Sequence, residues 1–393
     1  MKQDRFRVSI RQGGEPAAMT MEALREVVTE DYRGKSVLVK PNLGFLAATG
    51  SGIVTHAEVV RGVVRFMKEA GAKPFIGDSC IFGVNAREAF ERAGAAAVAR
   101  EEGVDIVNLD EGEPIFFDVE NPYAVDRVKI SSYAVQADAI VTVPVMKTHM
   151  YAGVSLSFKN MKGCLFQREK MRFHHLREEA RFAPWHGIKN LDRAVADLSS
   201  VLYPDLSVLD GIVAMEGMGP ILGETKPLGL VMASEDPIAA DIAGLFLMGF
   251  KPEDIPHVAL AAKKRGQVAS FEDLDLDRDA FTALRSPFRR AVAEDISAEY
   301  PEFMIKSGET CSACEATSMA FLKYYGKRFK GIDQVRIMLG RNIDAVGGAD
   351  GRCIVLGNCA AAYREMGIFL EGCPPIPSDI LKVVEGFGGN KVG

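Results

Sequence analysis

The fold is decided by the stretch SVLVKPN (36–42), THAEVVRGVVRFMKEAGA (55–72) and KPFIGDS (73–79). The first and third segments are short apolar runs of the kind that form buried strands, and the second has apolar residues at helical spacing. Thr55 is the expected N-cap of this helix and Gly71 its expected C-cap. A strand, a helix and a second strand in this order are typical of a parallel sheet covered by helices.

The same alternation continues to about residue 250. A helix is expected over 87–103 and another over 236–249, directly after the last apolar run. Further strands are expected at DIVNLD (105–110), AIVTVPVMKTH (139–149), LSVLDGIVAMEG (206–217) and LGLVMASE (228–235). We therefore predict an α/β fold with a mostly parallel sheet covered by helices, and a smaller α/β domain at the C-terminus.

Length and composition limit the class of protein. The chain has 393 residues, enough for two or three domains, and its 48% hydrophobic and 25% charged residues are ordinary for a globular protein. A formal net charge of −6 disfavours a general nucleic-acid or anionic-membrane surface. No signal peptide and no run of eighteen apolar residues is visible, so we expect a cytoplasmic protein without a membrane span. The sequence predicts no oligomeric state.

Three units are expected along the chain. Residues 1–270 form the main α/β domain, and 304–393 form a smaller domain with strands at QVRIMLG and CIVLG. The charged stretch 271–303 between them is expected to be a helical bridge.

Four cysteines of the last unit form the most specific chemical pattern. Cys311 and Cys314 make a CxxC pair, and Cys359 and Cys373 follow singly, each on a glycine-flanked turn after a strand-like run. Four thiolates are a cage for a soft metal centre. An iron–sulfur cluster is favoured over structural zinc, because zinc ribbons usually pair two CxxC knuckles. Uncoordinated or disulfide-paired thiols are the remaining alternative, and disulfides are disfavoured in a reducing compartment. Cys353 is a rival ligand, but its place at the start of an apolar strand favours a core position.

The three cysteine-bearing segments, TCSACEATSMAFL, CIVLGNCAAAYREMG and IFLEGCPPIPSDILKVV, resemble the proximal-cluster pattern of nickel–iron hydrogenase small subunits and the related respiratory complex I subunit. The resemblance covers about residues 305 to 390. It implies one [4Fe–4S] cluster held by Cys311, Cys314, Cys359 and Cys373. The segment is too short for the whole flavodoxin-like domain of those families, so only the cluster-holding part is implied.

Polar residues follow several of the predicted strands. Ligands of open α/β sheets bind beyond the carboxyl ends of the strands, where these residues would lie. The candidates with a predicted role in substrate binding are Lys40, Asn42, Asp78 and Glu216. Other polar residues at strand ends are Ser79, Asp210 and Asp236. A single polar residue at a strand end is usually a cap, so the prediction of a site depends on the convergence of several such residues at one edge of the sheet.

The segment KTHMYAGVSLSFKNMKG (147–163) is predicted to clamp an anion. Lys147 and His149 are the candidate catalytic residues, and Lys159, Asn160 and Lys162 the candidate substrate ligands. The alternative is a basic surface loop with solvated lysines. A second basic stretch is a possible lid over the same cleft or a solvated helix face, and it contains Arg168, Lys170, Arg172, His174, His175, Trp185 and His186.

A second resemblance covers about residues 30 to 265. KPNLG, ADAIVTVPVMKTH, SFKNMKG, VLDGIVAMEGMGPILG and ASEDPIAADIAG, in this order, are similar to the domain-of-unknown-function family 362. Members of that family often carry iron–sulfur motifs, and the resemblance implies little about the reaction. No P-loop, GxSxG elbow, HExxH or dinucleotide fingerprint is present.

The leading functional hypothesis is a redox protein whose cluster exchanges electrons with a small anionic substrate or a redox partner protein. One alternative is a non-redox lyase or isomerase with a structural cluster. Another is a protein that carries a cluster or metal to another enzyme.

Overall fold

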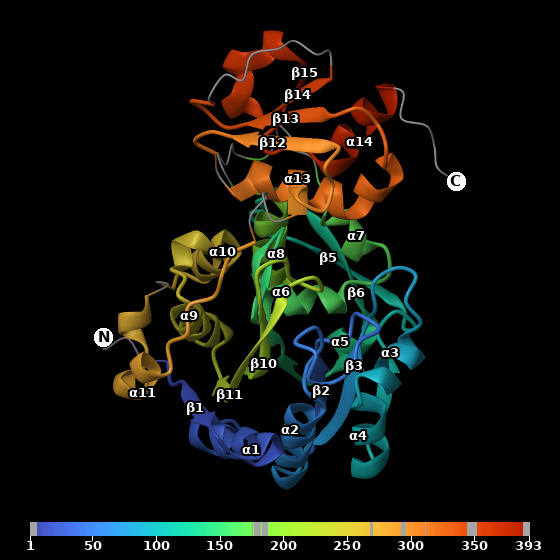
Figure 1. The fold of residues 1–393 in the computed structure, drawn as a ribbon. Coiled ribbons are helices and arrows are strands. Elements are labelled where there is room, and N and C mark those ends of the chain that lie inside the picture. The colour runs from blue at the N-terminus through green and yellow to red at the C-terminus, as the bar shows by residue number, and fades with distance from the viewer. Residues whose placement is uncertain are drawn as a thin grey trace.

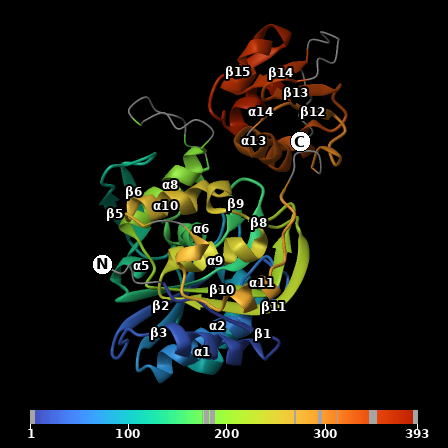
Figure 2. The same cartoon turned by 90° about the vertical axis from the view of Figure 1, so that its left-hand side faces the viewer.

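The computed structural model describes residues 6–174, 176, 182, 188–267, 270–291, 296–310, 312–343 and 352–387. Figure 1 shows a large α/β unit with a smaller unit, coloured orange to red, above it. Helix α13 (Ser312–Tyr325) lies on the side of the smaller unit that faces the larger one (Figures 1 and 2). The predicted α/β class, with a mostly parallel main sheet and a small C-terminal sheet, is confirmed.

Nine strands of the described chain form the main sheet, in the order β1-β11-β10-β7-β2-β3-β4, with β8 paired to β10 and β9 paired to β8. Their bounds are β1 (Ser9–Gln12), β2 (Ser36–Pro41), β3 (Lys73–Asp78), β4 (Ile106–Asn108), β7 (Ala139–Val143), β8 (Val145–His149), β9 (Gly153–Ser155), β10 (Leu206–Glu216) and β11 (Glu224–Ser234). From β10 to β4 the neighbouring strands are parallel. β11 is antiparallel to both β10 and β1. It is antiparallel to β10 because only a short turn separates these two strands and no crossover helix fits there.

Helices cover both faces of this sheet. One face packs against α1 (Pro16–Val27), α2 (Ala57–Glu69), α3 (Ala86–Arg92) and α4 (Ala95–Glu102). Of these, α1, α2 and α4 lie at the bottom of Figure 1. The other face packs against α6 (Ser157–Asn160), α8 (Asn190–Val201), α9 (Pro237–Met248) and α10 (Pro256–Lys264). Burial of the valine stripe on α2 fixes the orientation of that helix against the sheet. Outside these layers lie α5 (Ser132–Gln136), η1 (Met161–Cys164), α7 (Glu169–Arg172), η2 (Pro252–Asp254) and the antiparallel pair β5 (Pro114–Asp118) and β6 (Arg127–Ser131).

Two features of the predicted helices were wrong, the N-cap of one and the continuity of another. Thr55 does not cap α2; the Nδ1 atom of His56 accepts the hydrogen bond from the Glu58 amide instead. The hydroxyl of Thr55 donates to the Val143 carbonyl oxygen and is therefore engaged in tying two strand ends together. The single helix expected over 87–103 is broken into α3 and α4 because Gly94 adopts a left-handed conformation with φ of 80°.

The predicted strand over 139–149 is also two strands. β7 ends at Val143 and β8 begins at Val145, with Pro144 between them. Proline has no N–H to donate to a ladder, so the run breaks there. The break moves the later residues, including Lys147 and His149, from the β7 ladder to pairing with β10 and β9.

The smaller unit has a four-stranded, fully parallel sheet. Its order is β12-β13-β14-β15, with bounds β12 (Phe303–Ser307), β13 (Val335–Leu339), β14 (Cys353–Leu356) and β15 (Ile368–Leu370). The strands predicted at QVRIMLG and CIVLG are confirmed as β13 and β14. The accompanying helical segments are α13, η4 (Gly326–Phe329), η5 (Asn358–Met366) and α14 (Pro377–Gly386). In the segment predicted as a helical bridge, the described residues form η3 (Phe271–Asp273) and α11 (Arg278–Ala283), and β12 begins at Phe303.

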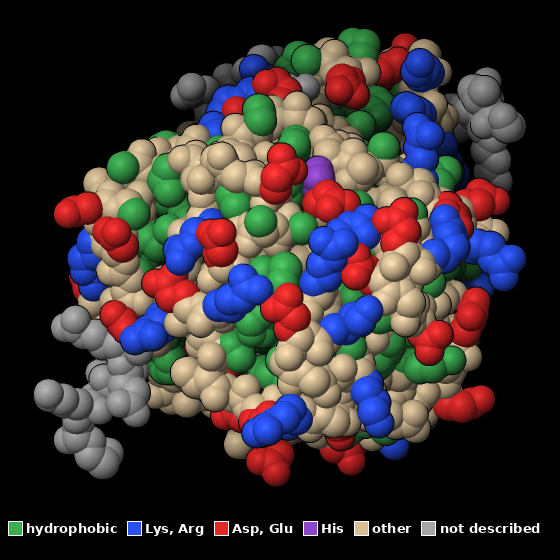
Figure 3. Space-filling model, turned by 90° about the horizontal axis from the view of Figure 1, so that it is seen from below, with side chains coloured by type: hydrophobic (Ala, Val, Ile, Leu, Met, Phe, Trp, Pro, Cys, Tyr) green, Lys and Arg blue, Asp and Glu red, His purple; other side chains and the backbone are tan. Residues whose placement is uncertain are grey.

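The lower face of the molecule carries charges of both signs. Figure 3 shows lysine and arginine side chains interspersed with aspartate and glutamate over this face. The ion pairs Arg25–Glu69 and Arg61–Glu102 belong to α1, α2 and α4 at this end of the molecule. This face therefore has no extended patch of one sign.

Candidate functional site

A cavity of about 770 Å³ lies beyond the carboxyl ends of β2, β3, β4 and β8. It is lined by most of the candidate site residues: Lys40, Asn42, Asp78, Lys147, His149, Lys159, Asn160 and Lys162. The carboxyl ends of parallel strands meet at one edge of the sheet, which explains why residues so far apart in the sequence converge here.

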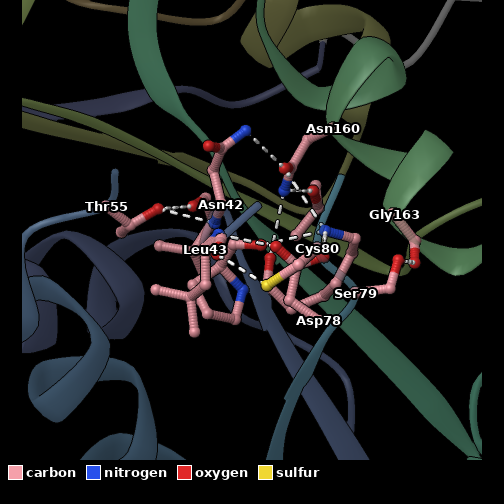
Figure 4. Close-up of polar contacts among 12 residues, drawn as sticks. Asn42, Leu43, Thr55, Asp78, Ser79, Cys80, Asn160 and Gly163 are labelled. Carbon is pink, nitrogen blue, oxygen red and sulfur yellow. Dashed lines mark hydrogen bonds and ion pairs between the residues drawn. The ribbon is translucent and has the colours of Figure 1, made fainter. Parts of the chain in front are cut away.

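At the base of the cavity, Lys40 and Asp78 form a buried ion pair. Lys40 Nζ lies 2.7 Å from Asp78 Oδ1, and the second carboxylate oxygen of Asp78 accepts the Leu43 amide at 2.6 Å. Figure 4 shows Asp78 directed at the backbone of Leu43. Gly163 lies against this pair so closely that a methyl group on it would overlap Asp78 Oδ1 and would lie 2.6 Å from Lys40 Nζ. The pair therefore joins β2 to β3 and to the turn at the end of η1.

Asn160 connects this pair to neighbouring strands. Its amide nitrogen donates to the Lys40 carbonyl oxygen at 3.1 Å and to the Thr142 hydroxyl at 2.9 Å. Its amide oxygen accepts from Asn42 Nδ2 and Lys40 Nζ, both at 3.3 Å (Figure 4). The polar groups of Lys40, Asp78 and Asn160 are thus hydrogen-bonded mainly within the protein, and this network forms a rigid floor of the cavity.

Lys147 projects from β8 into the same cavity and has no carboxylate partner among the described residues. Its side chain is only 1% exposed. Its ammonium nitrogen donates to the Ile53 carbonyl oxygen at 2.6 Å and lies 3.4 Å from Asn42 Oδ1. Burial, with a further contribution from the charge of Lys159, lowers the pKa of Lys147 to about 7. The amine therefore gains or loses its proton near neutral pH.

His149 lies two residues farther along β8. Its Nδ1 atom accepts hydrogen bonds from the backbone amides of Tyr151 at 3.0 Å and Ala152 at 3.1 Å. Burial, together with the charge of Lys159, lowers the pKa of His149 well below its usual value. A neutral imidazole that accepts at Nδ1 carries its proton at Nε2, so this side chain is a hydrogen-bond donor at its free nitrogen.

Two further lysines come from the short helical segments that follow β9, Lys159 from α6 and Lys162 from η1. Desolvation lowers the pKa of Lys159 to about 8 and the pKa of Lys162 well below its usual value. Lys162 Nζ lies 2.6 Å from Nε2 of His174, and the His174 ring stacks at 6.5 Å from the ring of His149. Neither lysine has a carboxylate partner in the described ranges.

Several cavity residues were missing from the predicted site. Lys170, which pairs with Asp110 at 2.6 Å, and His174 belong to the basic stretch considered as a lid. Arg168 of that stretch also lines the cavity, whereas His175, Trp185 and His186 lie outside the described residues. Helix α13 contributes Lys323, Tyr324 and Tyr325 to the wall. Their sequence, KYY, carries no motif, and only the folded chain brings it to this edge.

The charges around the cavity do not balance. Among the described residues, its lining includes six lysines and Arg168 but two carboxylates, Asp78 and Asp110, and each of these is paired with one lysine. The remaining lysines are Lys147, Lys159, Lys162 and Lys323. Burial lowers the pKa of each of them, including that of Lys323 to about 8. A negatively charged ligand would restore the charged form of these groups.

The structure does not bring Glu216 to this cavity. Its carboxylate pairs with Lys226 at 2.9 Å and with Arg289 at 3.3 Å, so it connects β10 to β11 and to the segment that leads to the smaller unit. Asp210 accepts the amides of His56 and Ile212, and Asp236 caps α9 by accepting the Ala239 amide. These two residues have the structural role of caps.

The cysteines follow the same topological rule in the smaller sheet. Cys314 lies in the first turn of α13, Cys359 follows β14, and Cys373 follows β15, so all three lie at the carboxyl ends of parallel strands. Cys311 lies outside the described residues. A methyl group on Gly357, whose φ is 86°, would lie 2.7 Å from Cys314 Sγ and 3.5 Å from the Gly372 carbonyl oxygen. The three segments therefore pack closely together.

Two observations qualify the cysteine pattern. Within the described ranges, no three His, Cys, Asp or Glu side chains converge as metal ligands do. Cys353 is buried at the amino end of β14, against the backbone of Gly367, and is therefore at the opposite end of the strand from Cys359.

Cys80 and Cys164 are buried beside the cavity floor, where desolvation raises the pKa of each thiol to about 12.

Comparison with known proteins gives a family. A family model described as a domain of unknown function, DUF362, matches residues 37–246, more than half of the chain. The chain belongs to the DUF362 family. The matched segment contains the whole cavity lining except the three residues of α13, and it does not reach the cysteine-bearing unit.

Two individual proteins are similar to this DUF362 chain. A thylakoid-associated protein, sll1697, of Synechocystis sp. (strain PCC 6803) is 32% identical over 231 residues, which cover 58% of this chain and 67% of that protein. The lactate racemase apoprotein of Thermoanaerobacterium thermosaccharolyticum is 13% identical, with a TM-score of 0.36, over 55% of this chain and 52% of that one. A likeness this weak carries no argument about activity. None of the helices in the described ranges is long and apolar enough to cross a membrane.

Proposed function

We propose that this DUF362 protein binds a small anionic substrate in the cavity of its α/β unit and acts on it there, with a [4Fe–4S] cluster in its C-terminal unit. One observation carries the first part: Lys147, Lys159, Lys162 and Lys323 line one cavity without a carboxylate partner in the described chain. Burying unpaired ammonium groups is costly, and an anionic ligand offsets that cost.

The cavity offers distinct groups for binding and for proton transfer. Lys159, Lys162 and Lys323 would bind the anion, and the fixed Lys40–Asp78 pair would hold the floor in place. Lys147, with a pKa of about 7, would exchange a proton with the substrate. His149 would donate a hydrogen bond from Nε2 to an oxygen on the substrate, since its Nδ1 is occupied by two amides.

The cysteines of the C-terminal unit would hold the cluster. Cys314, Cys359 and Cys373 come from neighbouring turns at one end of a parallel sheet, and glycines 357 and 372 let these turns approach. Cys311, which precedes α13, would complete the set of four thiolates. When bound, such a cluster supplies one electron at a time.

A redox role is supported by the place of α13. This helix carries Cys314 near its start and the cavity residues Lys323, Tyr324 and Tyr325 at its end. The substrate or a redox partner protein would be the other member of the electron exchange. The cavity residues would bind and orient the anion and exclude water around it.

The cluster and the anion site are tested separately. Anaerobically purified protein should contain iron and acid-labile sulfide in equal amounts and show a paramagnetic signal after reduction. Folded protein with stoichiometric zinc and no iron would rule out the cluster. Sulfate binding should be measurable by calorimetry and should weaken by about tenfold or more in Lys159→Gln. Lys226→Gln, which alters a lysine outside the cavity, is the matched control. Equal affinities in all three proteins would rule out the anion site.

A second candidate function is a non-redox lyase or isomerase whose cluster is structural. The pKa of Lys147 near 7 favours it, because a lysine that can be neutral at physiological pH is suited to remove a proton. Turnover of an anionic substrate that persists after the cluster is removed, with the fold intact, would favour this function over the redox one.

A further inference from the structure

We infer that the ligand of the lysine cavity is an amphiphilic anion, with at least two negative charges at one end and an aromatic or extended apolar body at the other. This inference rests on the proposed anion site and specifies its ligand class. Three features of the cavity lead to it: its volume, the position of its cations and the character of its mouth.

The cavity is too large for a small anion alone. Its volume of about 770 Å³ lies in the upper part of the range typical of pockets for drug-sized molecules, which is roughly 300–1,000 Å³. Sulfate, phosphate or a short dicarboxylate would fill only a fraction of it. A ligand that excludes water from the whole cavity must therefore carry a body as well as a charged group.

The cations lie deep in the cavity. Lys147 is 1% exposed and Lys162 is 7% exposed, and both are desolvated. Lys159 stands on the short helix α6 beside Asn160, next to the floor. Within the part of the chain that the structure describes, more than one of these lysines lacks a carboxylate partner, so a head group with two or more negative charges matches the site better than a single charge does.

Apolar side chains surround the entrance. The described residues include eight large hydrophobic side chains that are exposed, and four of them line this cavity: Ile81, Phe82, Met171 and Tyr324. Phe82 is 72% exposed and Tyr324 is 56% exposed. Exposed apolar side chains that gather at one opening mark a binding surface.

These four side chains come from three separate elements. Ile81 and Phe82 follow β3, Met171 belongs to α7, and Tyr324 belongs to α13. The guanidinium of Arg168 lies 5.6 Å from the centre of the Phe82 ring. Aromatic side chains at the mouth suit a flat or apolar body that stacks on them while the charged end reaches the lysines.

The test uses two phosphate monoesters with the same head group. Methyl phosphate and 2-naphthyl phosphate are titrated into the full-length protein at pH 8, and the dissociation constants are measured by calorimetry. We expect 2-naphthyl phosphate to bind about tenfold more tightly or better, from burial of its apolar surface. The uncharged 2-naphthol should bind far more weakly than 2-naphthyl phosphate.

Variants locate the effect. Phe82→Ala and Tyr324→Ala should each weaken binding of 2-naphthyl phosphate several-fold and leave methyl phosphate unchanged. Phe116→Ala is the matched control, because Phe116 is 53% exposed but does not line the cavity. All three sites are on the surface, so circular dichroism should report an unchanged fold.

The possible outcomes distinguish failure of the inferred ligand class from failure of the proposed anion site. If both phosphates bind with equal affinity, the ligand class is wrong and the anion site stands. If 2-naphthol binds as tightly as 2-naphthyl phosphate, the charged end contributes nothing and the inference is overturned. If neither phosphate binds, the anion site itself fails.

Discussion

Lys40 Nζ and Asp78 Oδ1 lie 2.7 Å apart with both side chains buried, and Gly163 leaves no room beside them. The pair joins the ends of β2 and β3 at the floor of the cavity. The atoms around the pair are packed so closely that a small change in a neighbouring residue should displace both charged groups.

Adding one methyl group at Gly163 should disturb this pair. In Gly163→Ala the new carbon would overlap Asp78 Oδ1, so either the turn or the pair must move. We expect the free energy of unfolding to fall by about 1–3 kcal/mol in urea titrations. Gly386→Ala is the control, because a methyl group there would meet nothing within 4 Å. Equal stability of the two variants would contradict the close contact.

Removing the negative charge should cost more. Asp78→Asn leaves the Lys40 ammonium buried without its partner, and loss of one member of a buried pair typically costs about 3–5 kcal/mol. Denaturant unfolding measures the difference. The control is Asp118→Asn, since the Asp118–Arg127 pair is at the surface and should contribute little. A variant as stable as the wild type would show that Lys40 is not dependent on Asp78.

Anion binding should be coupled to proton uptake. The pKa of Lys147 is lowered from 10.5 to about 7, so most of this amine is neutral at pH 8 in the unliganded protein. Sulfate favours the ammonium form and raises the pKa, so the protein should take up protons when it binds sulfate at pH 8. At pH 6 the ammonium is already formed, and uptake by Lys147 should be small.

Calorimetry in buffers of different ionisation enthalpy measures this uptake, since sulfate itself does not titrate in the range. Sulfate affinity should also fall as the pH rises above 8, where Lys159 and Lys323 lose their protons as well. An uptake at pH 8 that persists unchanged in Lys147→Met would assign the effect to other groups.

Serine substitutions should distinguish the cysteines. Cys359→Ser removes a proposed ligand at the carboxyl end of β14 and should lower the iron content of anaerobically purified protein. Cys353→Ser changes a buried residue at the opposite end of the same strand and should leave the iron content unchanged. Loss of iron in the Cys353 variant, with an intact fold, would exchange their roles.

The contact between Tyr151 and Thr317, whose hydroxyl also donates to the Pro375 carbonyl oxygen at 3.0 Å, should couple the two units. Tyr151 is buried beside the cavity, and its hydroxyl contacts the side chain of Thr317 on α13. In a double-mutant cycle of Tyr151→Phe and Thr317→Val, we expect a coupling energy of about 0.5–1.5 kcal/mol in the free energy of unfolding. Additive effects would indicate that the contact does not stabilise the interface.

The sequence predicted the sheet and the convergence of strand-end residues because both depend on local periodicity and on a general rule for parallel strands. SVLVKPN and KPFIGDS became β2 and β3, and Lys40 and Asp78 meet where these strands end. The antiparallel β11 was not predicted, because its apolar pattern is the same in either direction and only the length of the turn decides.

The errors at the site have physical reasons too. Glu216 follows a strand as Asp78 does, but β10 extends past the cavity and ends beside Lys226 and Arg289. Lys323 and Tyr324 could not be found, since their role depends on how a separate unit docks. The pKa of Lys147 depends on burial, which sequence spacing does not report.

The floor and one wall of the cavity come from different parts of the chain. The lysines of the floor lie within the DUF362 segment, whereas Tyr324 and its neighbours on α13 come from residues beyond it. Exchanging the C-terminal unit would therefore replace Lys323 and the aromatic side chains of α13, while Lys147, Lys159 and Lys162 would stay in place. A different C-terminal unit grafted onto this α/β unit would change which molecules enter the cavity and would leave the lysines of β8, α6 and η1 unchanged.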